Sequence, residues 1–171
     1  MTFDLMIYTS FHTALSMVAL VTGLWLLIGL SLESPLLALD AAVILTLLVT
    51  SVTGFFGFPF TKVLPSHVVG ILLLLVLAIV VWARYVRNLE GSAGFVYCVS
   101  LTVAVYLDAF VAVVQAFLKV PALHAIAPTQ QSPGFMAAQA MLLLVFIVLG
   151  IAAVRGIRRS HPLIQPARYS N

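Results

Sequence analysis

The sequence predicts an all-α polytopic membrane protein, a bundle of five transmembrane helices in a single membrane domain. Of its 171 residues, 63% are hydrophobic and 8% are charged, whereas soluble domains carry about 25% charged residues. Five apolar runs are long enough to cross a bilayer, which takes roughly 20 residues of helix. None of these runs alternates as a strand does, and lipid offers no partner for an open sheet edge, so we predict helices.

The first three runs are separated by turn residues. Ser34 and Pro35 follow the first run, and Pro65 suits the first turn of a third helix, where its missing N–H costs nothing. The segment Met1–Ser10 contains no Lys or Arg, unlike the positive region of a secretory signal peptide, so we expect the first run to be kept as a span. The three predicted helices cover residues 8–30, 36–58 and 66–86.

The fourth and fifth runs are joined by a longer connection that contains three prolines. These runs predict helices over residues 94–118 and 135–154, with a short surface helix around 122–126 between them. A basic segment, 155–171, follows the last helix and is expected to be a flexible tail. Beside five spans, a chain of this length has no room for a soluble domain.

The Lys and Arg residues of the connections predict how the bundle is oriented. The side that holds the N-terminus carries only Lys62 and Lys119. Because cytoplasmic connections carry an excess of Lys and Arg, the other side and the C-terminal tail are predicted to be cytoplasmic. We interpret the net charge of +3 as a topology signal, so the expected partner is the lipid bilayer and not a nucleic acid. The basic residues of the cytoplasmic side are Arg84, Arg87, Arg155, Arg158, Arg159 and Arg168.

Three of the four histidines are predicted to lie on the outer side. His12 lies about one turn inside the first helix and His67 opens the third, which runs in the same direction, so we expect similar depths. Imidazole is the commonest metal ligand, and this pattern suits a haem b or a transition metal held by His12 and His67, with His124 of the outer connection as a further metal ligand. The alternative is that each histidine caps a helix or hydrogen-bonds at the membrane boundary.

The fourth helix carries a second polar pattern. Asp108 lies near its middle, where a charged group is costly, and Gln115 and Lys119 follow on the same stripe of the helix. Gln115 and Lys119 join the histidines as predicted cofactor-binding residues, and Lys119 suits an anionic group such as a haem propionate. This polar stripe is suited to transferring protons along the helix or to binding a polar ligand. The alternative is that Asp108 hydrogen-bonds to threonines of the second helix, such as Thr46 and Thr50.

Other features of the chain exclude familiar chemistry. The sequence contains no GxSxG, HExxH, phosphate-binding or dinucleotide-binding motif, so no enzymatic activity follows from it. The one cysteine, Cys98, excludes an internal disulfide and is expected to be a small core residue. Asp40, near the start of the second helix, is expected at the membrane interface.

Four longer motifs resemble those of a family of small, uncharacterised bacterial inner-membrane proteins. The most specific is Gln-Ala-Phe-x-Lys-x-Pro-Ala-Leu, which begins at Gln115 and is followed by Ala-Pro-Thr-Gln at residues 127–130. The resemblance covers the second to fifth predicted helices, well over half of the chain. Besides residues 127–130, the motifs that carry it are Gly57–Phe60, Leu64–Gly70, Ala83–Tyr85 and Tyr106–Leu123.

The resemblance implies that the chain lies in a bacterial inner membrane. It also implies that His67, Gln115 and Lys119 belong to a characteristic motif on the outer side. Two positions depart from the family pattern: the family tends to have Asn at the position of Asp108, and an acidic residue at that of Gln131. The resemblance therefore does not imply a required carboxylate in the fourth helix. The family brings no established activity, so no catalytic residue follows from it.

Three functions are compatible with these patterns. The first is a haem- or metal-binding, redox-linked membrane protein built on His12 and His67. The second is a non-catalytic accessory or assembly subunit, indicated by the small size and the missing motifs, whose partners are other membrane subunits or copies of itself. The third is a small oligomeric carrier that uses the Asp108 stripe. The carrier ranks last because the sequence has no visible internal repeat.

Overall fold

The computed structural model describes residues 3–34, 37–56 and 65–160, and within these ranges every regular element is a helix. The predicted all-α fold class is thereby confirmed. The five long helices are α1 (Phe3–Ser31), α2 (Leu37–Phe56), α3 (Pro65–Val81), α4 (Ala93–Lys119) and α6 (Pro133–Ser160).

Two short elements join the long helices. The π-helical turn η1 (Trp82–Val86) continues α3, and a hydrogen bond of 3.0 Å runs from the Arg87 N–H to the Trp82 carbonyl. The short helix α5 (Pro121–Ile126) links α4 to α6 and coincides with the predicted surface helix. The predicted connection with Lys62 lies outside the described residues.

Four of the long helices are long and apolar enough to cross a membrane. The corresponding part of α2, Leu39–Phe55, is a shorter apolar helix, so the described residues hold four candidate spans where the sequence predicted five. The candidates nevertheless suit a membrane-embedded protein. They are Asp4–Ser31, His67–Val86, Ala93–Lys119 and Pro133–Ser160.

The last helix is longer than predicted. Because α6 continues to Ser160, Arg155, Arg158 and Arg159 lie on a helix, and the prediction of a flexible tail is wrong for these residues. Arginine is a good helix former, and cations near a helix C-terminus complement the helix dipole, which explains the extension. Residues 161–171, with Arg168, lie outside the described part of the chain.

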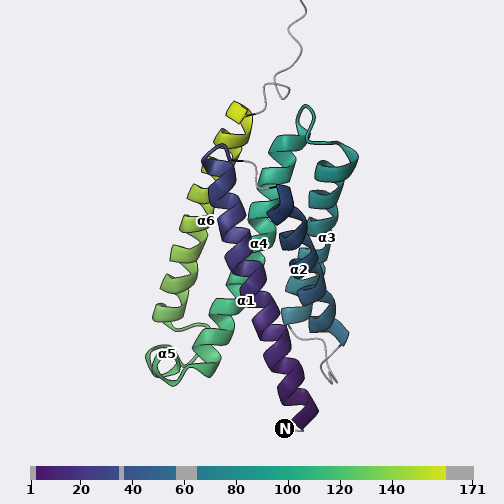
Figure 1. Ribbon diagram of the computed structural model, residues 1–171. Helices are drawn as coiled ribbons and strands as arrows, with labels where there is room; N and C mark the ends of the chain where they lie inside the picture. Colours follow the sequence, from purple (N-terminus) through teal and green to yellow (C-terminus); the bar gives the residue numbers. More distant parts are fainter. Residues whose placement is uncertain (1–2, 35–36, 57–64, 161–171) are drawn as a thin grey trace, which may run out of the picture.

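The long helices run alternately in opposite directions, so the bundle has two ends (Figure 1). The start of α1 and α5 lie at one end, which we call the α5 end. The end of α6 and the connection from α3 to α4 lie at the other, which we call the arginine end because it carries Arg84, Arg87 and Arg158. At the centre of the bundle is α4, which contacts α1, α2, α3 and α6.

Small residues allow the helices to pack closely. A β-carbon on Gly156 of α6 would lie 1.9 Å from the Leu30 carbonyl oxygen of α1, so any side chain there would push the two backbones apart. A β-carbon on Gly23 of α1 would lie 2.7 Å from Val105 Cγ2 of α4. Small residues at such crossings are typical of membrane helices, where close packing is the main source of association. These contacts join α1 to α4 and to α6.

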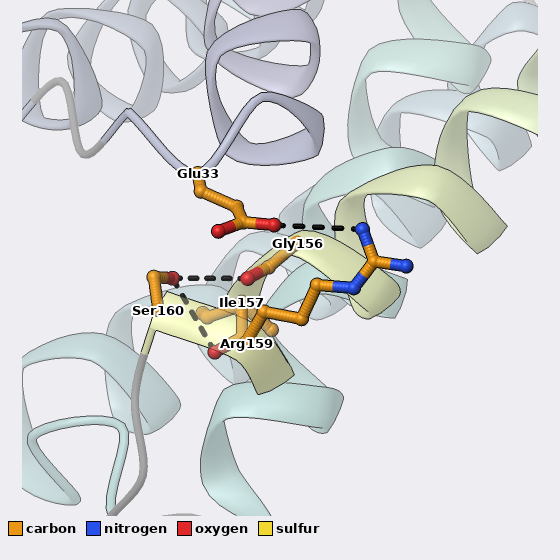
Figure 2. A network of polar contacts seen from close by, with 5 residues as sticks. All are labelled: Glu33, Gly156, Ile157, Arg159 and Ser160. Atoms are coloured by element: carbon orange, nitrogen blue, oxygen red, sulfur yellow. Dashed lines mark hydrogen bonds and ion pairs between the residues drawn. The ribbon is translucent and has the colours of Figure 1, made fainter.

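Figure 2 shows the polar contacts where α1 and α6 meet at the arginine end. Arg159 Nη1 lies 3.5 Å from Glu33 Oε1, and both side chains are exposed. The Ser160 hydroxyl donates to the Gly156 and Ile157 carbonyls, at 3.0 and 3.4 Å, and so satisfies carbonyls at the end of the helix. An exposed ion pair contributes only about 0–1 kcal/mol, so we assign the α1–α6 contact mainly to the packing at Gly156.

A buried ion pair joins α2, η1 and α4 near the arginine end. Asp40 is only 2% exposed. Arg84 Nε of η1 donates to one carboxylate oxygen, and the Tyr97 hydroxyl of α4 donates to the other. Partners from two neighbouring elements thus replace water at both of its oxygens. Asp40 lies in the first turn of α2, and its expected position at the membrane interface stays a prediction. The neighbouring Cys98 is fully buried in the core, as predicted.

Arg84→Gln is expected to destabilise the protein, because it leaves the buried Asp40 carboxylate without its cation. Breaking a buried pair costs about 3–5 kcal/mol, which is measurable as a lower thermal unfolding temperature in detergent. Arg159→Gln removes the exposed partner of Glu33 and is the matched control, with no resolved change expected. The double variant Arg84→Gln/Asp40→Asn should regain part of the loss. Equal effects of Arg84→Gln and Arg159→Gln would contradict the assignment.

Candidate functional site

A cavity of about 290 Å³ lies between α1, α2, α3 and α4, toward the α5 end. Its wall brings together five residues that the sequence singled out, from three different helices. It also carries five hydroxyl side chains, so it is unusually polar for the interior of so apolar a bundle. The predicted residues are His12, His67, Asp108, Gln115 and Lys119, and the hydroxyl residues are Thr9, Thr13, Ser16, Thr50 and Ser51.

His12 reaches from α1 to α2. Its Nδ1 lies 2.9 Å from the Thr53 hydroxyl oxygen, and that hydroxyl itself donates to the Val49 carbonyl at 2.8 Å. Because the hydroxyl proton is already engaged, His12 Nδ1 is the donor, and Nε2 is the ring nitrogen that carries the lone pair. Gly54 makes room for the imidazole, whose Cε1 would lie 3.4 Å from a β-carbon at that position. The contacts with α2 thus set both the orientation and the tautomer of the ring.

His67 lies in the first turn of α3 and also contacts α2. Its ring centroid is 5.6 Å from that of Phe55, with the planes tilted by 45°. Gly70, one turn further along α3, accommodates the same phenyl ring, because Phe55 Cε2 would lie 2.9 Å from a β-carbon there. The phenyl ring of Phe55 therefore fills the space above Gly70. This ring limits the size of any group that binds next to the His67 imidazole.

Asp108 lies at the deep end of the cavity and is 5% exposed. The Ser16 hydroxyl of α1 donates to its Oδ1 at 2.8 Å. The predicted bond to threonines of α2 is not found: the Thr46 hydroxyl donates to the carbonyl of Ala42 on its own helix, at 2.8 Å. Both Asp108 Oδ2 and Thr50 Oγ1 are buried without a hydrogen-bond partner among the described residues. Two such atoms in one cavity wall are uncommon, since buried polar groups are normally paired.

The polar stripe of α4 follows the cavity from its deep end to the end of the helix. Lys119 is the last residue of α4, and Asp108 lies eleven residues earlier, about 16 Å along the helix axis. This distance is roughly half of the hydrocarbon thickness of a bilayer, about 30 Å. Gln115 lies between the two, and neither Gln115 nor Lys119 is hydrogen-bonded to another described residue. The wall therefore offers donors near the helix end and a carboxyl group at depth.

His124 does not line this cavity. It lies on α5 with an exposed side chain, and its Nδ1 lies 3.3 Å from the Phe117 carbonyl oxygen at the end of α4. In the described ranges, no three His, Cys, Asp or Glu side chains gather closely enough to hold a metal ion. A metal site built from His12, His67 and His124 therefore finds no support there. Binding by His12 and His67 alone stays a prediction.

Sequence reasoning missed several of the hydroxyl residues, although a signal for them was present. Thr9 and Thr13 lie three residues before and one after His12, and four residues apart from each other, which is the spacing of one helix face. Ser51 neighbours Thr50, and its hydroxyl donates to the Leu47 carbonyl at 2.9 Å. Their role in the cavity wall depends on how α1 and α2 rotate toward each other, which no local pattern specifies.

Comparison of the chain with protein-family models, with curated proteins and with solved structures finds no match. The resemblance to a family of bacterial inner-membrane proteins therefore stays a prediction. The chemistry of the cavity is inferred from its own residues.

Ser16→Ala and Thr50→Val are expected to affect stability in opposite ways. Ser16→Ala removes the hydrogen bond to the buried Asp108 carboxyl and should lower the free energy of unfolding by about 1–3 kcal/mol. Thr50→Val replaces a buried hydroxyl that has no protein partner with a methyl group, and should be neutral or stabilising. Thermal unfolding of the purified variants in one detergent measures both. A loss in Thr50→Val as large as that in Ser16→Ala would contradict the described hydrogen bonding.

Proposed function

We propose that this chain is a five-span membrane protein that binds a compact polar ligand in the cavity between α1, α2, α3 and α4. One observation carries the proposal: Asp108 Oδ2, buried with no hydrogen-bond partner in the described part of the chain, lies in the same cavity wall as two imidazoles and the Lys119 ammonium. Purely structural polar groups in a membrane bundle pair with one another. Asp108 Oδ2 and Thr50 Oγ1 instead line a cavity without a hydrogen-bond partner among the described residues, which suits a ligand that binds to them.

The five-span topology rests on the position of α2. This helix contacts both α1 and α3 and has 20 residues, which span about 30 Å as an α-helix. It therefore matches the bilayer thickness even though its most apolar part is short. Five antiparallel spans place the two chain termini on opposite sides of the membrane.

The orientation follows from the arginine end. In the described part of the chain, Arg84, Arg87, Arg155, Arg158 and Arg159 all lie there, and Lys119 is the only Lys or Arg at the α5 end. The positive-inside rule then favours a cytoplasmic arginine end in a bacterial inner membrane, with the cavity opening on the outer side.

Cysteine labelling is expected to report this orientation. Ala125→Cys on the exposed face of α5 should react with a membrane-impermeant maleimide in intact spheroplasts, whereas Arg159→Cys should react only after lysis. Cys98 is fully buried and serves as an internal blank. The reverse pattern would invert the orientation. Labelling of both positions from the same side would contradict an odd number of spans.

The lining indicates which ligand fits. Lys119 and Gln115 offer donors at the α5 end, so the ligand presents an anionic or carbonyl group there. Asp108, at depth, pairs with a donor or shares a proton with the ligand. The volume of about 290 Å³ is at the lower end of the range for ligand pockets, about 300–1,000 Å³. Because Phe55 also covers Gly70, the cavity favours a compact molecule over a tetrapyrrole such as haem b.

A transition metal is the second candidate, favoured by the placement of His12 and His67 in one cavity wall. In this case His12 Nε2 would be the ligating atom, because Nδ1 is bonded to Thr53. The roles of accessory subunit and oligomeric carrier stay predictions that no described contact favours.

Native mass spectrometry of the detergent-purified protein tests both candidates, together with metal analysis and an absorption spectrum of the same sample. We expect a small-molecule adduct on the wild type that falls at least tenfold in Asp108→Asn and in Lys119→Gln. Glu90→Gln and Arg87→Gln make the same charge changes outside the cavity and should keep the adduct. A metal that is lost in His12→Ala and His67→Ala would establish the second candidate instead. Folded wild-type protein that carries neither adduct nor metal would overturn both.

A further inference from the structure

A second hollow lies on the other side of α4, as a groove of about 460 Å³ between α4 and α6. Its wall is almost entirely apolar, and several of its side chains face outward: Phe95 is 42% exposed, Leu143 44% and Ile151 47%. Along α6 the lining runs from Leu143 to Arg158, which is about 22 Å of helix. One leaflet of a bilayer contributes about 15 Å of hydrocarbon, so the groove has the length of an acyl chain plus its head-group region.

The floor of the groove is formed where α4 and α6 approach most closely. A β-carbon on Gly150 would lie 3.0 Å from Thr102 Cγ2. Because Gly150 has no side chain, the two helices can approach closely here and the groove stays open above them. The Thr102 hydroxyl donates to the Cys98 carbonyl of its own helix at 2.7 Å, so its polar atom is already satisfied. The floor therefore presents carbon atoms, which suits a hydrocarbon chain.

Two arginines line the groove at its end nearest the arginine end of the bundle. Arg155 and Arg158 are three residues apart, hence on one face of α6, and both line the groove. Neither forms an ion pair within the described residues, whereas Arg84 pairs with Asp40 and Arg159 with Glu33. The Arg158 guanidinium lies 5.5 Å from the centre of the Phe95 ring, which holds it at the groove mouth.

We propose that this groove binds an anionic phospholipid, with one acyl chain along the groove and the phosphate between Arg155 and Arg158. Guanidinium groups bind phosphate oxygens in pairs of hydrogen bonds, and basic residues at the membrane surface attract anionic head groups. The apolar wall matches the acyl chain of such a molecule, and the two arginines, which form no ion pair with another described residue, match its phosphate. A second copy of the chain docked symmetrically would instead bring two further arginines to the same place, which disfavours it as the occupant.

The test is retention of dioleoyl-phosphatidylglycerol by the purified full chain, measured by native mass spectrometry against dioleoyl-phosphatidylcholine with the same acyl chains. We expect the wild type to retain the anionic lipid at least tenfold better. Arg155→Gln/Arg158→Gln should lose most of this preference. Arg87→Gln/Arg159→Gln removes the same charge at the same end of the bundle and should keep it.

A second variant tests the groove itself. Ile147→Trp adds bulk at an outward-facing groove position, which is 47% exposed, and should reduce retention of the anionic lipid several-fold without unfolding the chain. Equal retention of the two lipids by the wild type would overturn the proposal, and so would equal losses in the two double-arginine variants. A dimer that dissociates in Ile147→Trp while lipid retention is unchanged would assign the groove to a second copy instead.

Discussion

The ion pair between Asp40 and Arg84 shows the constraint under which this bundle is built. Charged groups surrounded by apolar helices are stable only where neighbouring elements supply the hydrogen bonds that water would otherwise make. At Asp40 this is achieved in full, because Arg84 and Tyr97 approach the carboxylate from two different elements. The position of α2 against η1 and α4 is thereby set near the arginine end.

The second buried carboxylate, Asp108, has fewer partners in the described part of the chain. Around Asp108 only one of the two carboxyl oxygens is bonded to a described residue, and Thr50 and Lys119 add further polar groups to the same hollow. The bundle therefore has one region where a buried carboxylate is bonded at both oxygens and a second where, among the described residues, it is bonded at one. The first region holds the helices together. The second suits the ligand that we propose for the cavity, because functional sites commonly leave local hydrogen bonding incomplete.

Much of this arrangement could be predicted from sequence, because the relevant signals are periodic or compositional. The apolar runs predict the helices, and the seven- and eleven-residue spacings from Asp108 place Gln115 and Lys119 on the same wall. Contacts between distant segments could not be predicted. Ser16 and Asp108 are 92 residues apart, and Asp40 and Arg84 are 44 apart, so their pairing depends on how whole helices rotate against each other. From the sequence, Arg84 is interpreted only as a topology signal, and its pairing with the buried Asp40 carboxylate is not predicted.

The absence of a side chain at Gly156 has a consequence for how the chain assembles. Because the Leu30 carbonyl oxygen would lie 1.9 Å from a β-carbon there, the backbones of α1 and α6 pack directly against each other at this crossing. Membrane helices emerge from the ribosome in order, so this contact can form only after α2, α3 and α4, and then α6 itself, have been synthesised. A chain truncated before α6 would therefore leave the surface of α1 around Leu30 without this partner, exposed to lipid and to quality control.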